Sequence, residues 1–241
     1  WDVFSRYAHY LNQEIAPATV FLASAGNGGP GYGTARSPAG GTILSVGAVT
    51  AIGQVKQMET VGPGQFTWGN TQFFSNRGPD ALGGLAPEVC AAGSWGAAPW
   101  PLNASPANGE AAYTIFSGTS MACPGAAGAL ALAAEAFESE RGRRPDWREA
   151  RELLLGGARD LHHDPLLQGA GMVDAAASLR LALGETWRVT PPQWTPGAYR
   201  GARQEGFPAL LFPGETDSAR FTVDNPATQS LILNISDVIY N

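Results

Sequence analysis

The sequence predicts an α/β fold, in which a mostly parallel sheet carries helices on both faces and is followed by a partial β-sandwich. Near the N-terminus, a helical pattern precedes the apolar run 19–24 and a glycine-rich loop. A continuous apolar run of strand length is typical of a parallel strand that is buried on both faces. The Ala- and Leu-rich stretch 120–137 carries no charge before Glu135, which predicts a buried helix. Short β-branched runs beyond residue 200 predict a second, β-rich region.

The composition fits one large domain, or one and a half ordinary ones, with an acidic surface. The chain has 241 residues, 44% of them hydrophobic, and a formal net charge of −6. That charge argues against nucleic-acid binding, which requires a basic surface. The apolar runs are shorter than the roughly 18 residues that cross a membrane, so no transmembrane segment is expected. Cys90 and Cys123 fit no metal-binding spacing; a disulfide between them stays open, although two reduced, buried thiols are favoured.

The first half of the chain alternates helices, strands and loops. Residues 3–15 carry apolar side chains at helical spacing, so an amphipathic helix is expected there. A second buried strand is predicted over 42–49, and a short strand over 113–116. Between them lie two hairpin-like runs, 54–58 and 65–68, and a proline-containing loop over 93–110 with exposed tryptophans at Trp95 and Trp100. Such a loop either flanks a substrate or is a surface loop fixed by its own aromatic side chains.

The second half predicts three helices and then β structure. After the helix over 120–137, an amphipathic helix follows over 145–155 and ends at Gly156 and Gly157. A last helix ends near residue 183, and a proline-rich linker leads to short strands at 210–212, 219–223 and 231–235. The expected domains are therefore 1–183, a linker over 184–197, and the start of a β-sandwich over 198–241.

Ser120 stands at the N-terminus of the long predicted helix. Gly118 permits a sharp turn before it, and Pro124, which has no N–H to donate, fits best in about the first helical turn. The dipole and the unpaired N–H groups of a helix N-terminus favour developing negative charge. A serine at this place is usually a helix cap, so the position alone does not identify a nucleophile.

The residues around Ser120 carry a family resemblance. Residues 118–124, Gly-Thr-Ser-Met-Ala-Cys-Pro, closely resemble the active-site serine motif of the subtilisin-like serine proteases, or subtilases. Residues 24–27, Ser-Ala-Gly-Asn, resemble a second signature, and both stand in the family's order. Weaker resemblances lie at 37–39, 74–79, 86–93 and 168–175; at Ala92 the family pattern has proline. The resemblance covers about residues 1–183 and implies the C-terminal part of a catalytic domain, with an incomplete sheet.

The resemblance implies roles for five residues. Ser120 is the nucleophile of a serine endopeptidase, and the side chain of Asn27 donates to the oxyanion. Asn before Gly is otherwise usually a plain turn residue. Ser24, Ala25 and Gly26 line the pocket for the residue before the scissile bond. The resemblance further implies a cis peptide bond between residues 37 and 38 and a secreted or extracellular location.

The catalytic aspartate and histidine are not recognisable in this chain. In the family they precede the oxyanion asparagine and the serine. Upstream of Asn27 the chain has Asp2, His9 and Glu14, in surroundings unlike the family's motifs, so neither role is assigned. Two functions stay open: a serine endopeptidase whose Asp and His lie on an N-terminal part of the catalytic domain, in the same or a separate chain, or a non-catalytic subtilase-like binding or assembly module. The intact Ser120 and Asn27 favour the first, with a protein or peptide substrate.

No cofactor is assigned from the sequence. The consecutive His162, His163 and Asp164 have no fourth ligand at a suitable spacing, so a solvated loop is favoured over a metal site. A structural calcium ion stays open, without residues to hold it.

Overall fold

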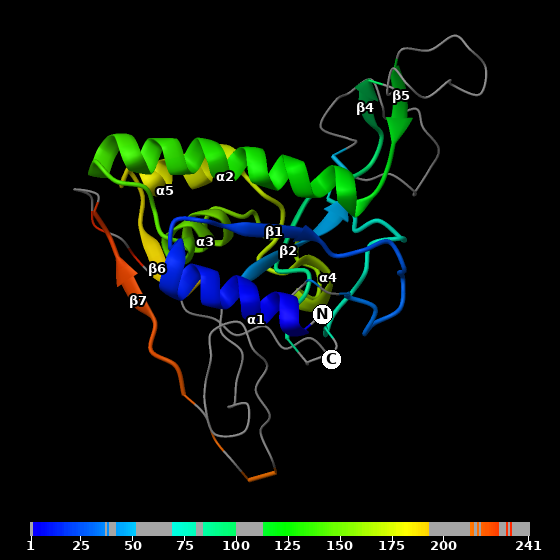
Figure 1. Cartoon of the computed structure of the whole chain (residues 1–241), viewed down its shortest axis with the longest axis horizontal. Coiled ribbons are helices and arrows are strands. Elements are labelled where there is room, and N and C mark those ends of the chain that lie inside the picture. Colours follow the sequence, from blue (N-terminus) through cyan, green and yellow to red (C-terminus); the bar gives the residue numbers. More distant parts are fainter. Residues whose placement is uncertain are drawn as a thin grey trace.

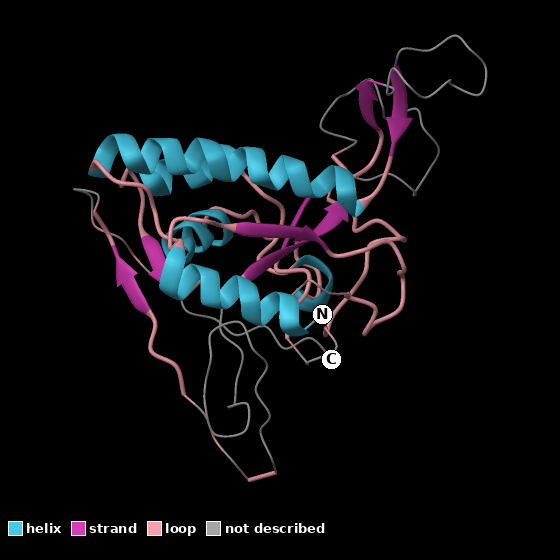
Figure 2. Cartoon of the chain, in the orientation of Figure 1, coloured by secondary structure: helices cyan, strands magenta, loops and turns pink. Residues whose placement is uncertain are grey.

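The computed structural model describes residues 2–36, 38, 42–51, 69–80, 84–99 and 113–192, with the shorter stretches 213–214, 216, 218–226, 230 and 232. Figures 1 and 2 show the described elements in space. In chain order they are α1 (Asp2–Tyr10), the π-helix η1 (Leu11–Ile15), β1 (Phe21–Ser24), β2 (Ile43–Val49), β3 (Val89–Ala92), β4 (Gly96–Pro99), β5 (Tyr113–Phe116), α2 (Thr119–Arg141), α3 (Trp147–Gly156), α4 (Pro165–Gln168), α5 (Ala175–Ala182), β6 (Arg188–Thr190) and β7 (Thr222–Asp224). The predicted hairpin-like runs 54–58 and 65–68, Trp100 and the Ser37–Pro38 bond lie outside the described residues.

A parallel sheet of three strands, in the order β1-β2-β3, lies at the centre of the fold. Phe21 pairs with Ile43 and Val46 with Val89, so the two runs predicted as strands lie in one sheet, as expected. The central strand β2 is buried along its whole length. In contrast, β1 is at the described edge of the sheet and only half-buried, so it is less buried than predicted.

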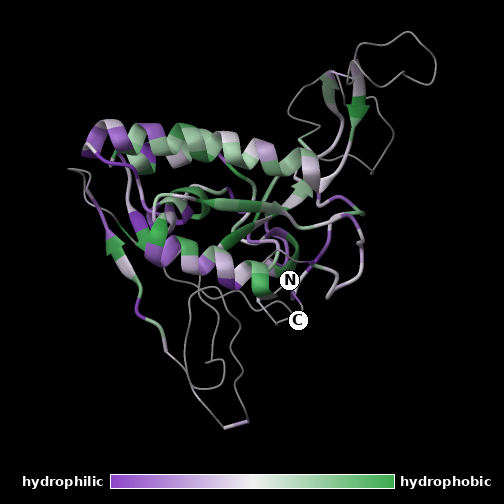
Figure 3. Ribbon diagram, viewed as in Figure 1, coloured by the Kyte–Doolittle hydropathy of each residue, from purple (hydrophilic) through white to green (hydrophobic). Residues whose placement is uncertain are grey.

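The long helix α2 packs across the sheet and contacts all three strands as well as α3 and α5. Most side chains on its buried face are small, which lets the strands approach closely. The buried residues include Ala122, Ala126, Ala129, Leu130 and Ala133, with Phe137 near the end of the helix. Figure 3 shows a hydrophobic middle of α2 over hydrophobic β1 and β2, and a hydrophilic end that leads to α3. The composition of this helix predicts burial all round, but Leu132 on the other face is 55% exposed.

Pro124 occupies the second turn of α2 rather than the first, where its missing N–H removes the helical bond to the Ser120 carbonyl. By length and composition alone α2 could cross a membrane. Its packing against the sheet and two helices is the arrangement of a core helix.

The helix α1 lies on the side of β1 and β2 away from α2 (Figure 1). The helix predicted near the N-terminus is therefore present. With α1 on one face and α2 on the other, the sheet carries helices on both faces, as predicted. The inward positions of α1 are small or polar, namely Ser5 and Ala8, and Asn12 of η1 continues this buried side. Its outward face carries large apolar side chains that are 51–77% exposed, namely Val3, Phe4, Tyr7 and Tyr10. Within the described chain this apolar face remains open to solvent.

A second, antiparallel sheet of two strands projects beside the N-terminus of α2 (Figure 1). In it, β5 forms as predicted, and Phe116 pairs with Gly96 of β4. The strand β4 lies in the stretch 93–110 that was expected to be a loop, so that expectation is wrong at this point. Trp95, just before β4, is 45% exposed, as expected.

The remaining elements follow the sequence patterns closely. A capping box at Asp146 and Glu149 starts α3, and Gly157 ends it. The strand β6 falls within the predicted linker and pairs with β7 of the predicted β-rich region. The division of the chain into domains stays a prediction. Both cysteines are free, Cys90 buried and Cys123 half-buried, so the open disulfide alternative is wrong.

Candidate active site

Ser120 is the second residue of α2, at the point where the chain turns from β5 into the helix. The N–H groups of Met121 and Ala122 both donate to the Gly118 carbonyl, which closes the first turn. The first N–H groups of a helix have no partner within it, and that of Ser120 is among them. The Ser120 side chain is exposed. An exposed hydroxyl therefore stands beside backbone donors at the positive end of a 23-residue helix.

Asn27 follows β1 and faces the start of α2. Its Oδ1 accepts hydrogen bonds from the Thr119 backbone N–H, at 2.9 Å, and from the Thr119 hydroxyl, at 2.8 Å. A backbone N–H can only donate, so the oxygen of the amide must face Thr119. The Nδ2 group, with its two N–H bonds, is then turned toward the other side of the residue.

That nitrogen lies beside the position that a side chain at Gly118 would take. A Cβ placed on Gly118 would be 3.3 Å from Asn27 Nδ2, 3.4 Å from Met121 Sδ and 3.7 Å from the Ser120 nitrogen. Because residue 118 is glycine, no side chain fills this position. The Asn27 amide and the Ser120 N–H therefore border one small space next to the exposed hydroxyl, which is the arrangement that a developing oxyanion requires.

Ser24, Ala25 and Gly26 lead from β1 to Asn27. Ala25 is fully buried, whereas Ser24 and Gly26 are half-buried. The Gly26 N–H donates to the Thr119 hydroxyl at 3.2 Å. Gly26 has φ +100°, a backbone conformation that favours glycine. This loop is thus fixed against the start of α2 on the same side as Asn27.

Thr119 is a site residue that the sequence analysis did not single out. It is fully buried, and its hydroxyl bridges the Gly26 N–H and the Asn27 side chain. The motif around Ser120 includes Thr119, but the bridge joins residues that are 92 or 93 positions apart. No local pattern in the sequence could reveal it.

The three histidines take part in other contacts. The ring of His9 meets that of Trp147 edge-on, with centroids 6.4 Å apart. His162 Nδ1 lies 3.3 Å from an Asp160 oxygen, and His163 Nε2 lies 3.1 Å from the Gly69 carbonyl. Asp164, which follows His163 directly, caps α4: its side chain accepts a hydrogen bond from the Leu166 N–H. Among the described residues, no group of three His, Cys, Asp or Glu side chains could hold a metal ion.

Burial affects the ionisation of both thiols. Cys123 lies one helical turn after Ser120, and burial raises the pKa of its thiol. Burial also raises the pKa of Cys90 to about 12, although a backbone hydrogen bond opposes this. The thiolate is the reactive form of cysteine, so burial disfavours the reactive form of both residues.

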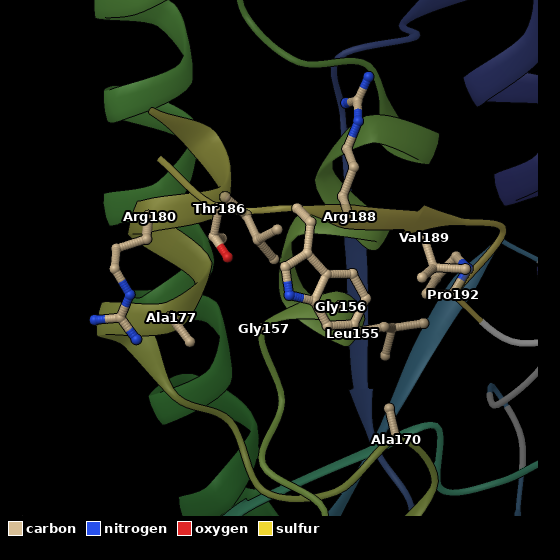
Figure 4. A pocket seen from close by; sticks show the side chains of 12 residues that line it. Leu155, Gly156, Gly157, Ala170, Ala177, Arg180, Thr186, Arg188, Val189 and Pro192 are labelled. Carbon is tan, nitrogen blue, oxygen red and sulfur yellow. The ribbon is translucent and has the colours of Figure 1, made fainter. Parts of the chain in front are cut away.

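Figure 4 shows a pocket in another part of the molecule, between α3, α5 and the segment 186–192. Its volume is about 360 Å³, and Gly156, Gly157 and Ala170 are part of its lining. Neither Ser120 nor Asn27 borders it. The candidate active site is therefore a surface formed by the start of α2 and the loop after β1, and it does not coincide with this pocket.

Comparisons with known proteins agree with the sequence motifs. The profile of the Subtilase family matches residues 2–172. Tripeptidyl-peptidase 2 of Arabidopsis thaliana is 34% identical over 167 residues, which is 64% of this chain and 11% of that protein. The protein of the same name from Oryza sativa subsp. japonica is 29% identical over 175 residues, or 68% of this chain and 12% of its own length. The chain thus spans about a ninth of the length of these relatives.

Solved structures show the same fold. A lanthipeptide protease superposes with a TM-score of 0.56 at 21% identity, over 75% of this chain and 55% of that one. The patellamide maturation protease PatA gives a TM-score of 0.52 at 23% identity, over 75% and 56% of the two chains. Since the family profile covers well over half of the sequence, this chain belongs to the subtilase family.

Proposed function

We propose that this chain supplies the nucleophile and the oxyanion site of a serine endopeptidase. The peptide bond is hydrolysed through an acyl-enzyme on Ser120, and the general base and the residue that orients it, a histidine and an aspartate, lie outside this chain. The observation that carries the proposal is that Asn27 Nδ2 and the Ser120 nitrogen both border the position of the missing Gly118 side chain, beside the exposed residue Ser120.

In the proposed mechanism the Ser120 hydroxyl attacks the scissile carbonyl while the histidine accepts its proton. The carbonyl oxygen becomes negative and moves into the space beside Gly118, where Asn27 and the Ser120 N–H donate to it. Collapse of the intermediate expels the amine, which takes the proton from the histidine, and water then releases the acyl group from Ser120 by the same steps. Ser24, Ala25 and Gly26 lead directly to Asn27, which suits a wall for the residue before the scissile bond.

The uncovered surfaces of the fold support a missing N-terminal part of the catalytic domain. The strand β1 is the described edge of the parallel sheet, and the outward face of α1 carries exposed aromatic side chains. Unpaired strand edges and apolar patches are normally covered by other polypeptide. The solved subtilases that superpose on this chain are nearly twice as long as the matched part. We propose that this part carries the Asp and His, on the same or on a separate chain.

Labelling with a serine-directed fluorophosphonate tests the proposal. An unassisted hydroxyl keeps its proton at neutral pH, so the 241-residue chain by itself should label poorly. The full-length protein should label at Ser120, and Ser120→Ala should abolish both the label and peptide hydrolysis. A full-length, folded protein that neither labels nor cleaves peptides would favour the alternative, a non-catalytic binding or assembly module.

The products of hydrolysis separate two kinds of peptidase. The curated relatives carry the name tripeptidyl-peptidase, which favours release of tripeptides from a chain end as a second candidate activity. Mass spectrometry of a digested protein with a blocked N-terminus distinguishes the two. Internal fragments support the endopeptidase, whereas cleavage that requires a free N-terminus and yields a series of tripeptides supports the second candidate.

A further inference from the structure

Asn76 is a fully buried side chain in the segment that lies against the loop after β1. Its Oδ1 accepts from the Gly28 N–H at 2.6 Å, and its Nδ2 donates to the Ala25 carbonyl at 2.8 Å. Its backbone N–H donates to the Gly26 carbonyl at 3.0 Å. Three hydrogen bonds from one residue therefore reach the positions on both sides of Asn27.

The packing around these bonds is tight. A Cβ on Gly26 would lie 2.3 Å from Asn76 Nδ2, and one on Gly28 would lie 3.1 Å from Asn76 Oδ1. A Cβ on Gly29 would lie 2.4 Å from the Ser75 carbonyl oxygen. The glycines of this loop thus leave room for Asn76 to reach the backbone, which gives them a second role besides forming a turn.

The chemistry at this position suits asparagine. The side chain meets one carbonyl, which needs a donor, and one N–H, which needs an acceptor. A primary amide supplies both, whereas a carboxylate lacks the donor and serine is too short to span both sites. A buried polar group that loses its partner is costly, so the pair of bonds holds the loop strongly.

Asn27 is therefore fixed from two directions. Thr119 holds the oxygen of its side-chain amide, and Asn76 holds the backbone on either side of it. Donors to an oxyanion act by being in place before the charge develops, so a loop that shifts by a fraction of an ångström weakens them.

We propose that Asn76 is a positioning residue of the oxyanion site, which acts on the reaction through Asn27. This inference rests on the proposed function of Ser120 and Asn27. It predicts that loss of the Asn76 amide lowers the rate of the chemical step and leaves substrate binding almost unchanged.

A double-mutant cycle in the full-length protein tests this inference. Asn76→Ser should lower kcat about tenfold, with KM within about twofold, because only the transition state uses the oxyanion donors. Asn27→Ala should lower kcat by more. In the Asn27→Ala background, Asn76→Ser should have no further effect, because the donor that it positions is gone. The isosteric Asn76→Asp, which keeps the acceptor for Gly28 but loses the donor for Ala25, should not restore kcat.

The matched control is Asn12→Ser. Asn12 is also a buried asparagine, and its Nδ2 donates to the Thr19 carbonyl, which lies outside the loop 25–28. This variant should lower the thermal stability and leave kcat unchanged. Rates are taken per fluorophosphonate-reactive site, so that unfolded protein does not enter them.

The outcomes are distinguishable. Two results would overturn the positioning role of Asn76 and leave the proposed peptidase function intact. One is a tenfold fall in kcat when Asn76→Ser is added to Asn27→Ala, and the other is an unchanged kcat in Asn76→Ser alone. A wild-type protein that neither labels nor cleaves overturns the proposed function and this inference together.

Discussion

At the scale of single residues, the Thr119 hydroxyl adds a second hydrogen bond to the Asn27 amide oxygen, which the Thr119 backbone N–H already holds at 2.9 Å. It donates to Asn27 Oδ1 at 2.8 Å and accepts from the Gly26 N–H at 3.2 Å. Thr119→Val removes both bonds of the hydroxyl and keeps the backbone N–H bond to Asn27 Oδ1, so the Asn27 amide is held by one bond instead of two and the Gly26 N–H loses its partner. We expect kcat of the full-length protein to fall about tenfold, which corresponds to about 1.4 kcal/mol in the barrier. Thr119→Ser keeps the hydroxyl and should retain most of the activity; equal losses in both variants would contradict this role.

Gly118 is open to a different test, since under the proposed function the oxyanion takes the position of its missing side chain. Its φ of 163° is extended backbone that alanine can adopt, and the nearest atoms to a new Cβ, Asn27 Nδ2 at 3.3 Å and Met121 Sδ at 3.4 Å, are side-chain atoms that can move by a few tenths of an ångström. Gly118→Ala should therefore fold, yet place a methyl group where the oxygen must go. Removal of one oxyanion donor in another member of this family lowers kcat by about 10²–10³-fold, and we expect a loss of that order. Thermal unfolding within a few degrees of the wild type, together with slow fluorophosphonate labelling, is the expected result.

At the scale of elements, α3 depends on its first turn. The Asp146 side chain accepts from the N–H groups of Arg148 and Glu149, both at 2.8 Å, and Glu149 returns a bond to the Asp146 N–H. Asp146→Ala should lower the free energy of unfolding by about 1 kcal/mol, the usual cost of losing an N-cap. Asp146→Ser should recover most of it in urea denaturation, because serine also caps helices.

The sequence predicted most helices and strands because their signals are local. The helix α3 shows both its cap and its glycine stop, and β2 is a continuous apolar run. The strand β4 has no such signal: Gly96, the two alanines and Pro99 are poor strand formers, and it forms because it pairs with β5. The exposed face of α2 escaped prediction because composition does not tell which side of a helix is covered.

The candidate site divides in the same way. Ser120 and Asn27 stand in contiguous motifs, so the sequence alone singled them out. Thr119 and Asn76 act through contacts between positions 48 or more apart, which only the folded chain brings together. The catalytic roles themselves, like the secreted or extracellular location, stay predictions.

At the scale of the whole molecule, Glu152 joins α3 to β6 and makes stability depend on pH. The Thr190 hydroxyl donates to its Oε2 at 3.2 Å, and burial raises the pKa of the carboxyl, opposed by that hydrogen bond and by the charge of Arg188. A raised pKa means that the folded state holds the proton more tightly than the unfolded one. Stability should therefore fall as the pH rises through the window just above the ordinary glutamate pKa.

Glu152→Gln removes this titration and keeps an oxygen that can accept from Thr190. The difference in melting temperature between the variant and the wild type should grow in favour of the variant from about pH 4 to pH 7. A difference that is constant over this range, or that grows in favour of the wild type, would contradict the direction of the pKa shift.

The hydrogen bonds that fix Asn27 and the start of α2 all come from residues of this chain. Under the proposed function, contacts within this chain hold the part of the site that receives negative charge. Such a chain on its own would be inactive, with its oxyanion site already formed. After it is mixed with the remainder of the domain, cleavage should begin at a rate that is set by the association of the two pieces and that rises with their concentrations. Little further delay is expected, because the residues around Ser120 need not rearrange.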